Sequence, residues 1–246
     1  MGIFDLFKDN KKIITYPKTS AIIAAAGNGS RMSGVCEDKL FLSFGEKEVI
    51  AHTLDAFENA ETITEIVVVT SENNIVQIGD LVNGYGFKKV KCVVKGGKTR
   101  QISVGIGLEN ISEDAEYISV ADGARPFIKT SVINFVNFKA YTYMAAAACV
   151  KVIDTIKQID EEGLIAKTVD RSKLLAVQTP QSFKKDIYLE AIEKANRMNY
   201  DFTDDCQLME LMGRKIYPVM SDYYNIKITT PEDVAFAKAI FESKIE

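Results

Sequence analysis

The chain has 246 residues, of which 47% are hydrophobic and 26% are charged. This length and balance predict one large α/β domain with a substantial core and exclude a disordered or fibrous chain. The formal net charge of -4 argues against a global attraction to nucleic acid, so an anionic ligand must be held by a local group of cations.

The cysteines and the histidine limit the chemistry further. The four cysteines, Cys36, Cys92, Cys149 and Cys206, show no CxxC spacing, which favours reduced thiols in a cytoplasmic protein over a disulfide framework or a zinc site. The only histidine is His52, which excludes a His-based metal cluster and argues against a Ser-His-Asp triad.

The start of the chain reads as an extension outside the fold. Its apolar residues precede its lysines, the reverse of a secretory signal peptide. The longest apolar run, residues 143–150, is too short to cross a bilayer, and we expect no membrane partner. We therefore predict an N-terminal extension at 1–18 and a single domain at 19–246.

Strand and helix patterns alternate through the first 150 residues. Apolar or β-branched runs predict strands at 20–26, 65–70, 90–94, 117–121 and 144–150, and helical spacing predicts helices at 49–57, 72–85 and 99–109. Such alternation implies a doubly wound, mainly parallel sheet. Near the C-terminus, Thr230 as N-cap followed by Pro231 predicts the start of a further helix.

The alternation of strand and helix patterns ends after residue 150. Segments 151–160 and 164–169 alternate apolar and polar residues around a turn at 160–163, which predicts a hairpin within a projecting β-arm at about 151–178. Because an isolated hairpin is marginally stable, we expect a partner subunit to pack against this arm.

Candidate anion-binding residues follow the predicted strands. Gly27 and Gly29 form a tight turn that lets backbone N–H groups approach a phosphate chain, and Arg31 adds a cation. A dinucleotide-binding loop fits poorly because Met32 occupies the third glycine position, and no Walker A pattern follows.

Three further charged residues are expected near that loop. Lys39 follows Arg31 closely, Asp122 ends a strand, and Lys227 precedes the last helix. Taken singly, each has a simpler reading as a surface or turn residue. Ligands of such sheets bind outside the carboxyl ends of the strands, so these residues are expected to converge on one crevice.

From about Ser20 to the C-terminus the chain resembles the 2-C-methyl-D-erythritol 4-phosphate cytidylyltransferase family. The matching motifs, in family order, are AAAGNGSRM, DKLF, GGKTRQISV, DGARPF, DTIK, TVDRS, AVQTPQSF, TDD and NIKITTPEDV. The resemblance implies a three-layer Rossmann-like nucleotidyltransferase fold with a mainly parallel twisted sheet, a homodimer clasped by the arms, and Mg²⁺ or another divalent cation held mainly by the CTP phosphates. It also implies transfer of CMP from CTP to 2-C-methyl-D-erythritol 4-phosphate, with release of pyrophosphate, in non-mevalonate isoprenoid biosynthesis.

The resemblance assigns roles to individual residues. Nucleotide binding is implied for Ala25, Ala26, Gly27, Gly29, Arg31, Lys39, Gly97, Ser103, Asp122 and Gly123. Substrate binding is implied for Asp122, Arg125, Thr155, Arg171, Thr179 and Lys227, with Asp122 also a possible metal ligand. Arg31, Lys39, Lys227 and Arg171 are implied to be catalytic through their charge.

The proposed chemistry needs no general base. A phosphate monoester has a second pKa near ~6 and is mostly a dianion at neutral pH, so the enzyme must bring two anions together and stabilise the charge that develops.

Two alternatives remain open at this stage. Ribitol-5-phosphate cytidylyltransferase shares the chemistry, although residues 168–172 resemble the methylerythritol branch more. A non-catalytic nucleotide-binding regulator is the other alternative. Ala121, Lys98 and the Cys206-Gln207 pair depart from the family pattern, but none of these departures removes a phosphate-binding cation.

Overall fold

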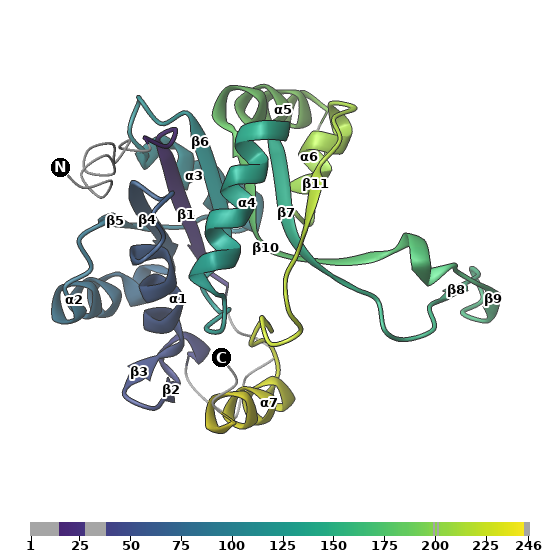
Figure 1. Cartoon of the computed structure of the whole chain (residues 1–246), viewed down its shortest axis with the longest axis horizontal. Coiled ribbons are helices and arrows are strands. Elements are labelled where there is room, and N and C mark those ends of the chain that lie inside the picture. Colours follow the sequence, from purple (N-terminus) through teal and green to yellow (C-terminus); the bar gives the residue numbers. More distant parts are fainter. Residues whose placement is uncertain (1–14, 28–37, 199, 201, 244–246) are drawn as a thin grey trace, which may run out of the picture.

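The computed structural model describes residues 15–27, 38–198, 200 and 202–243. Its centre is a seven-stranded sheet (Figure 1). In spatial order the strands are β11 (Tyr217–Met220), β7 (Ala145–Lys151), β10 (Leu175–Lys184), β6 (Tyr117–Asp122), β1 (Thr19–Ala25), β4 (Glu65–Thr70) and β5 (Val90–Lys95). All neighbouring strands are parallel except that β10 runs antiparallel to both β6 and β7.

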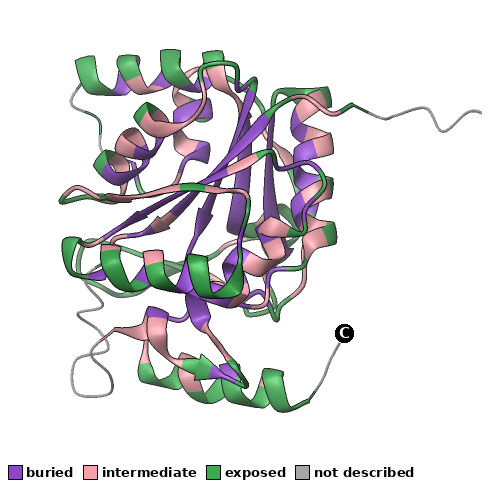
Figure 2. Cartoon of the chain, turned by 90° about the vertical axis from the view of Figure 1, so that its left-hand side faces the viewer, coloured by how far each residue is buried: buried purple, intermediate pink, exposed green. Residues whose placement is uncertain are grey.

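Helices cover both faces of the sheet, which gives three layers (Figures 1 and 2). The α-helices are α1 (Val49–Glu58), α2 (Ile75–Tyr85), α3 (Arg100–Asn110), α4 (Thr130–Tyr143), α5 (Lys185–Arg197), α6 (Cys206–Leu211) and α7 (Pro231–Glu242). Along β1, Ala21 and Ile23 face the core formed with α1, α2 and α4, whereas Ile22 faces the opposite side, where α3 packs. The buried sheet explains why the strands read as continuous apolar runs.

Most of the predicted elements are present. The predicted strand at 65–70 is observed with those bounds, and the other predicted strands and helices differ by a residue or two, except that a 3₁₀ turn, η4 (Glu72–Asn74), precedes α2. Thr230 caps α7 as predicted, and its backbone N–H donates to Asp233 Oδ2 at 2.8 Å. The prediction of a mainly parallel α/β sheet is confirmed, with β10 as an antiparallel strand that sequence periodicity did not identify.

The arm projects from the sheet between β7 and β10 (Figure 1). Its hairpin is much shorter than predicted, because only β8 (Lys157–Ile159) and β9 (Ile165–Thr168) pair. The predicted turn at 160–163 is present, and Gly163 takes a φ of +82°, a conformation that favours glycine. Residues 151–156, predicted as strand, contribute only Lys151 to β7. With so few paired residues, the arm is held mainly by the strands at its base.

Smaller elements lie at the edges of the domain. A 3₁₀ turn, η3 (Lys39–Phe41), precedes the short hairpin of β2 (Ser43–Phe44) and β3 (Lys47–Glu48). Another 3₁₀ turn, η5 (Arg171–Lys173), lies in the arm. Before β1, the Tyr16 ring lies 5.1 Å from the Phe138 ring, measured between centroids, so the described end of the extension contacts α4. The division at residue 18 stays a prediction. Among the described residues no helix is long and apolar enough to span a membrane.

A buried polar chain fixes α4 on β10. Asn137 is fully buried; its Nδ2 donates to Thr62 Oγ1 at 2.7 Å, and its Oδ1 accepts from Ser182 Oγ at 2.6 Å. Each of these groups would be costly to bury without its partner. The network therefore joins the antiparallel strand to the helix layer.

We expect Asn137→Ala to lower the free energy of unfolding by about 2–4 kcal/mol, because it leaves a cavity and two buried hydroxyls without their amide partner. Chemical denaturation measures this loss. Thr142→Ala removes an exposed hydroxyl from the same helix and is the control, for which we expect little change. Equal losses in the two variants would contradict the role given to the network.

Candidate functional site

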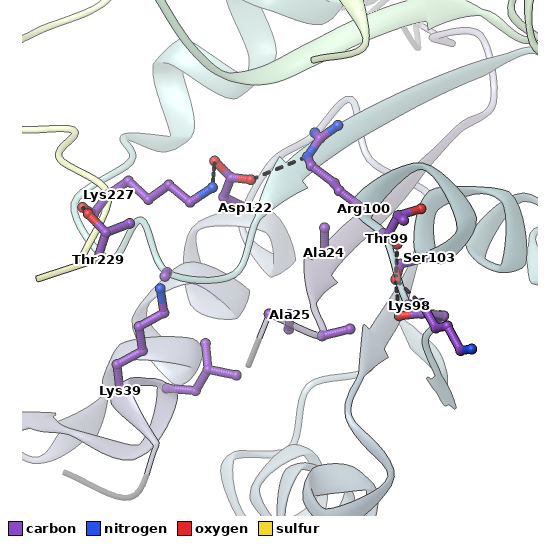
Figure 3. A pocket seen from close by; sticks show the side chains of 15 residues that line it. Ala24, Ala25, Lys39, Lys98, Thr99, Arg100, Ser103, Asp122, Lys227 and Thr229 are labelled. Carbon is purple, nitrogen blue, oxygen red and sulfur yellow. Dashed lines mark hydrogen bonds and ion pairs between the residues drawn. The ribbon is translucent and has the colours of Figure 1, made fainter. Parts of the chain in front are cut away.

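A cavity of about 310 Å³ opens at the carboxyl ends of the central strands. It is lined by Ala24, Ala25, Ala26, Gly27, Lys39, Leu40, Gly97, Lys98, Thr99, Arg100, Ser103, Asp122, Ala124, Lys227 and Thr229. Figure 3 shows Lys39, Lys227 and Thr229 on one side of Ala24 and Ala25, and Lys98, Thr99 and Ser103 on the other. The cavity therefore has one side that carries Lys39 and Lys227 and another side built from the start of α3.

The α3 side depends on two glycines that lie close to other chain segments. A Cβ on Gly96 would lie 2.6 Å from the Ala26 Cβ, and a Cβ on Gly97 would lie 2.1 Å from Ile102 Cγ2. Ser103 is buried, and its Oγ accepts from the Gly97 N–H at 3.1 Å and donates to the Thr99 carbonyl at 2.9 Å. The residues between β5 and α3 are thus held as one rigid turn against the end of β1.

Asp122 is the acidic centre of the cavity. It is 6% exposed, and Lys227 Nζ lies 3.1 Å and Arg125 Nε 3.3 Å from its Oδ2, while Arg100 Nε lies 3.8 Å from its Oδ1. Burial alone would raise the pKa of the Asp122 carboxyl, but Lys227, Arg125 and Arg100 together outweigh burial and hold that pKa below its usual range. Asp122 is therefore a carboxylate at neutral pH.

Other predicted residues support Asp122 from behind the cavity. The Asp122 N–H donates to Thr179 Oγ1 at 3.0 Å, and Arg125 Nη1 donates to the Asn225 carbonyl at 2.6 Å. The Gly123 N–H donates to the Ala24 carbonyl at 2.9 Å, and a Cβ on Gly123 would lie 2.8 Å from Ile50 Cδ1. None of Thr179, Arg125 and Gly123 lines the cavity among the residues that the structure describes.

Lys39 reaches the cavity from η3. Asp38 caps this turn, with its Oδ1 accepting from the Leu40 N–H at 2.9 Å. The Asp38 Oδ2 accepts from Asn74 Nδ2 at 2.5 Å, and Asn74 is buried in η4. One carboxylate thus joins the turn that carries Lys39 to the loop after β4.

The charge of the described lining is positive. It contains four cations, Lys39, Lys98, Arg100 and Lys227, and one carboxylate, Asp122, which gives +4 − 1 = +3. Such a cavity favours a polyanion. No group of three or more His, Cys, Asp or Glu side chains that could hold a metal occurs within the described ranges. A divalent cation here would take its ligands mainly from a bound polyphosphate, with Asp122 the one carboxylate of the described lining.

Four predicted site residues remain, two outside the described residues and two on the arm. Gly29 and Arg31 lie outside the described residues, so the structure does not place the loop cation. Thr155 and Arg171 lie on the arm and do not line the cavity described here. Arg171 Nη1 donates to the Ile153 carbonyl, a bond within the arm.

Sequence reasoning gave no role to Arg100, although it lies inside the matching motif GGKTRQISV. Its place at the first turn of a helix that follows the Gly96-Gly97 turn was a usable indication. Its partner Asp205, by contrast, is distant in sequence and is brought to it only by the fold.

The three-layer sheet with a cationic cavity at its strand ends defines an α/β nucleotidyltransferase-like protein. The family model of 2-C-methyl-D-erythritol 4-phosphate cytidylyltransferase matches residues 19–243. The chain belongs to this family, which confirms the resemblance seen in its motifs.

Individual relatives agree with this membership. A Clostridium botulinum (strain Okra / Type B1) protein named 2-C-methyl-D-erythritol 4-phosphate cytidylyltransferase is 42% identical over 92% of this chain and 98% of its own length. A protein of the same name from Caldanaerobacter subterraneus is 43% identical over 89% and 96%. Among solved structures, the 4-diphosphocytidyl-2C-methyl-D-erythritol synthase of Anaerococcus prevotii has a TM-score of 0.82 at 32% identity, covering 92% of this chain and 96% of that one.

Asn74→Ala tests whether η4 holds the turn that carries Lys39. We expect it to weaken CTP binding about three- to tenfold, because Asp38 loses its anchor and the turn becomes more mobile. Calorimetric titration with CTP measures the effect. The neighbouring exposed Asn73→Ala is the matched control and should bind CTP as the wild type does. Unchanged affinity in Asn74→Ala would contradict this role.

Proposed function

We propose that this protein transfers CMP from CTP to 2-C-methyl-D-erythritol 4-phosphate, giving 4-diphosphocytidyl-2-C-methyl-D-erythritol and pyrophosphate in non-mevalonate isoprenoid biosynthesis. The observation that carries the proposal is a cavity lined by Lys39, Lys227 and Asp122, with Lys227 paired to Asp122, in a chain of this family. The relatives' names favour this substrate over ribitol 5-phosphate and favour an enzyme over a non-catalytic regulator.

The two sides of the cavity suit the two ends of CTP. We assign the triphosphate to the side with Lys39 and Lys227, because two ammonium groups there can neutralise phosphate oxygens. We assign the cytosine to the α3 side, where the Gly97 backbone and Ser103 present polar groups. The lining next to them is formed by Ala25, Ala26 and Gly27. Asp122 then lies between these ends, within reach of ribose hydroxyls.

Catalysis in this proposal is mainly electrostatic. The incoming phosphate is already a dianion at neutral pH, so no residue has to remove a proton. Lys39 and Lys227, with Arg31 from the loop outside the described residues, would stabilise the negative charge that builds up on the α-phosphate and the departing pyrophosphate. Lys227 is also paired with Asp122, which fixes its position before the nucleotide enters.

A divalent cation, Mg²⁺ by preference, fits this donor set. The triphosphate would supply most of its oxygen ligands, and Asp122 would be the residue of the described lining to offer a carboxylate oxygen. When bound, the ion supplies further neutralisation of phosphate charge.

We also propose a homodimer clasped by the arms. The arm carries exposed apolar side chains, among them Ile153 at 62% and Ile165 at 69% exposure, which a monomer would leave in water. Figure 1 shows the arm extending away from the body of its own chain. Thr155 and Arg171 would then hold the sugar phosphate in the cavity of the other subunit.

We infer the cellular location from the cysteines. The three described cysteines, Cys92, Cys149 and Cys206, are unpaired thiols, which supports a reducing, cytoplasmic location. The partners we propose are CTP, the sugar-alcohol phosphate and a second copy of the chain, without nucleic acid or membrane.

Lys39→Ala and Lys227→Ala should each lower kcat by about 10²–10³-fold with the fold intact, because each removes one preorganised cation. A pyrophosphate-release assay with CTP and each sugar phosphate measures this and also distinguishes the two substrates. Lys238→Ala, an exposed lysine on α7, is the matched control. Near-wild-type turnover in both cavity variants would remove these lysines from the mechanism.

Mixing two inactive variants tests the shared site. If Arg171 acts in the cavity of the other subunit, a heterodimer of Arg171→Ala and Lys227→Ala chains has one intact site. Random re-association should then restore about a quarter of wild-type activity. If Arg171 served its own chain, both sites of the heterodimer would be defective and mixing would restore nothing. Sedimentation of each variant confirms that dimers have formed.

A further inference from the structure

A buried ion pair connects the cavity to the helix layer on the far side of the sheet from α4. Asp205, directly before α6, is fully buried, and Arg100 Nη2 donates to its Oδ2 at 2.6 Å. The second oxygen, Oδ1, accepts from the Tyr188 hydroxyl on α5 at 2.5 Å. Both oxygens of a carboxylate without solvent contact are therefore satisfied, as such burial requires.

The protonation states of this group favour a fixed arrangement. Burial opposes the charge on Arg100, but the Asp205 carboxylate outweighs burial and raises the pKa of the guanidinium. Burial and then Asp205 raise the pKa of the Tyr188 phenol far above its usual value, so its hydroxyl remains a donor. Neither group should titrate in the working range of the protein.

Arg100 also faces Asp122, but in a different way. The separation of 3.8 Å between its Nε and Asp122 Oδ1 is too long for a hydrogen bond, whereas Lys227 and Arg125 both contact Oδ2 more closely. The cation therefore attracts Oδ1 without occupying it, and Oδ1 stays able to accept a bond from a ligand.

Asp205 is the hydrogen-bond partner that holds the guanidinium. Nη2 is taken by Asp205, and Nη1 is buried with no hydrogen-bond partner among the described residues. An unpartnered buried donor costs free energy, so this placement does not serve stability alone. What the arrangement does achieve is to hold one cation at a fixed distance from the carboxylate of the cavity.

We propose that Arg100 and Asp205 are positioning residues that act through Asp122: Asp205 anchors the Arg100 guanidinium, and Arg100 in turn orients Asp122 with Oδ1 free for the nucleotide or its metal ion. This inference rests on the proposed function. In Asp205→Asn the anchor loses its charge, so Arg100 can move onto Oδ1 and close it to the ligand.

A double-mutant cycle with Asp122 tests the proposal. Asp205→Asn and Arg100→Lys should each lower kcat/KM about tenfold in the wild-type background but less than about twofold in Asp122→Asn, because the residue through which they act is already changed. The cycle is read from pyrophosphate release and, independently, from the Kd of CTP. Glu72→Gln, which breaks the exposed pair with Lys95, is the control and should change neither.

Two results of the cycle would overturn the proposal. Equal losses in both backgrounds would mean that the pair is merely structural, and wild-type values in Asp205→Asn and Arg100→Lys would give it no role; either overturns the proposal. Should Asp205→Asn fail to fold, Tyr188→Phe keeps the ion pair, loosens the anchor, and should give a smaller loss that is again absent in Asp122→Asn. A wild type that binds CTP but releases no pyrophosphate would contradict the proposed function, while the cycle in Kd would still test the network.

Discussion

The arrangement of the cavity depends on a single carboxylate surrounded by cations. Asp122 is almost fully buried, and three positive side chains from three different parts of the chain converge on it: Arg100 from α3, Arg125 from the turn after β6, and Lys227 from the segment before α7. Without Asp122 these cations would repel one another across a few ångströms of low dielectric. With it, they are held ready beside a space that a polyanion can enter.

Close backbone packing makes that concentration of charge possible. Glycines at 96, 97 and 123 lie where an added Cβ would meet a neighbouring atom at 2.1–2.8 Å. Gly96 and Gly123 allow the loops after β5 and β6 to approach the end of β1, and Gly97 lets the turn before α3 pack against Ile102. Ser103 then holds this turn through its bond with the Gly97 N–H. The rigidity of these turns supports electrostatic catalysis, because charges that are already in place need no reorganisation when the nucleotide arrives.

The arm is built differently from these closely packed turns. Its two strands pair over only a few residues, and it leaves isoleucines in water, whereas its base is continuous with β7 and with the antiparallel β10. Ser182 on β10 is bonded to Asn137 of α4 inside the core, so the strand that leads out of the arm is anchored in the domain. A segment built in this way can carry Arg171 far from its own sheet without loosening the sheet.

The local features of this protein can be predicted from its sequence. The strands β1, β4, β5, β6 and β7, the cap at Thr230 and the motifs that identify the family follow from apolar periodicity, turn chemistry and residue spacing, which are all properties of short segments. Long-range packing, by contrast, sets the antiparallel position of β10 between β6 and β7, the short arm hairpin, and the contact between Asp205 and Arg100. These outcomes depend on which distant surfaces pack together, and Arg100 and Asp205, more than 100 residues apart, meet because α3 and α6 share one face of the sheet. Pairing across such a separation leaves no periodic pattern in the sequence, since the free energy that selects it comes from the assembled core.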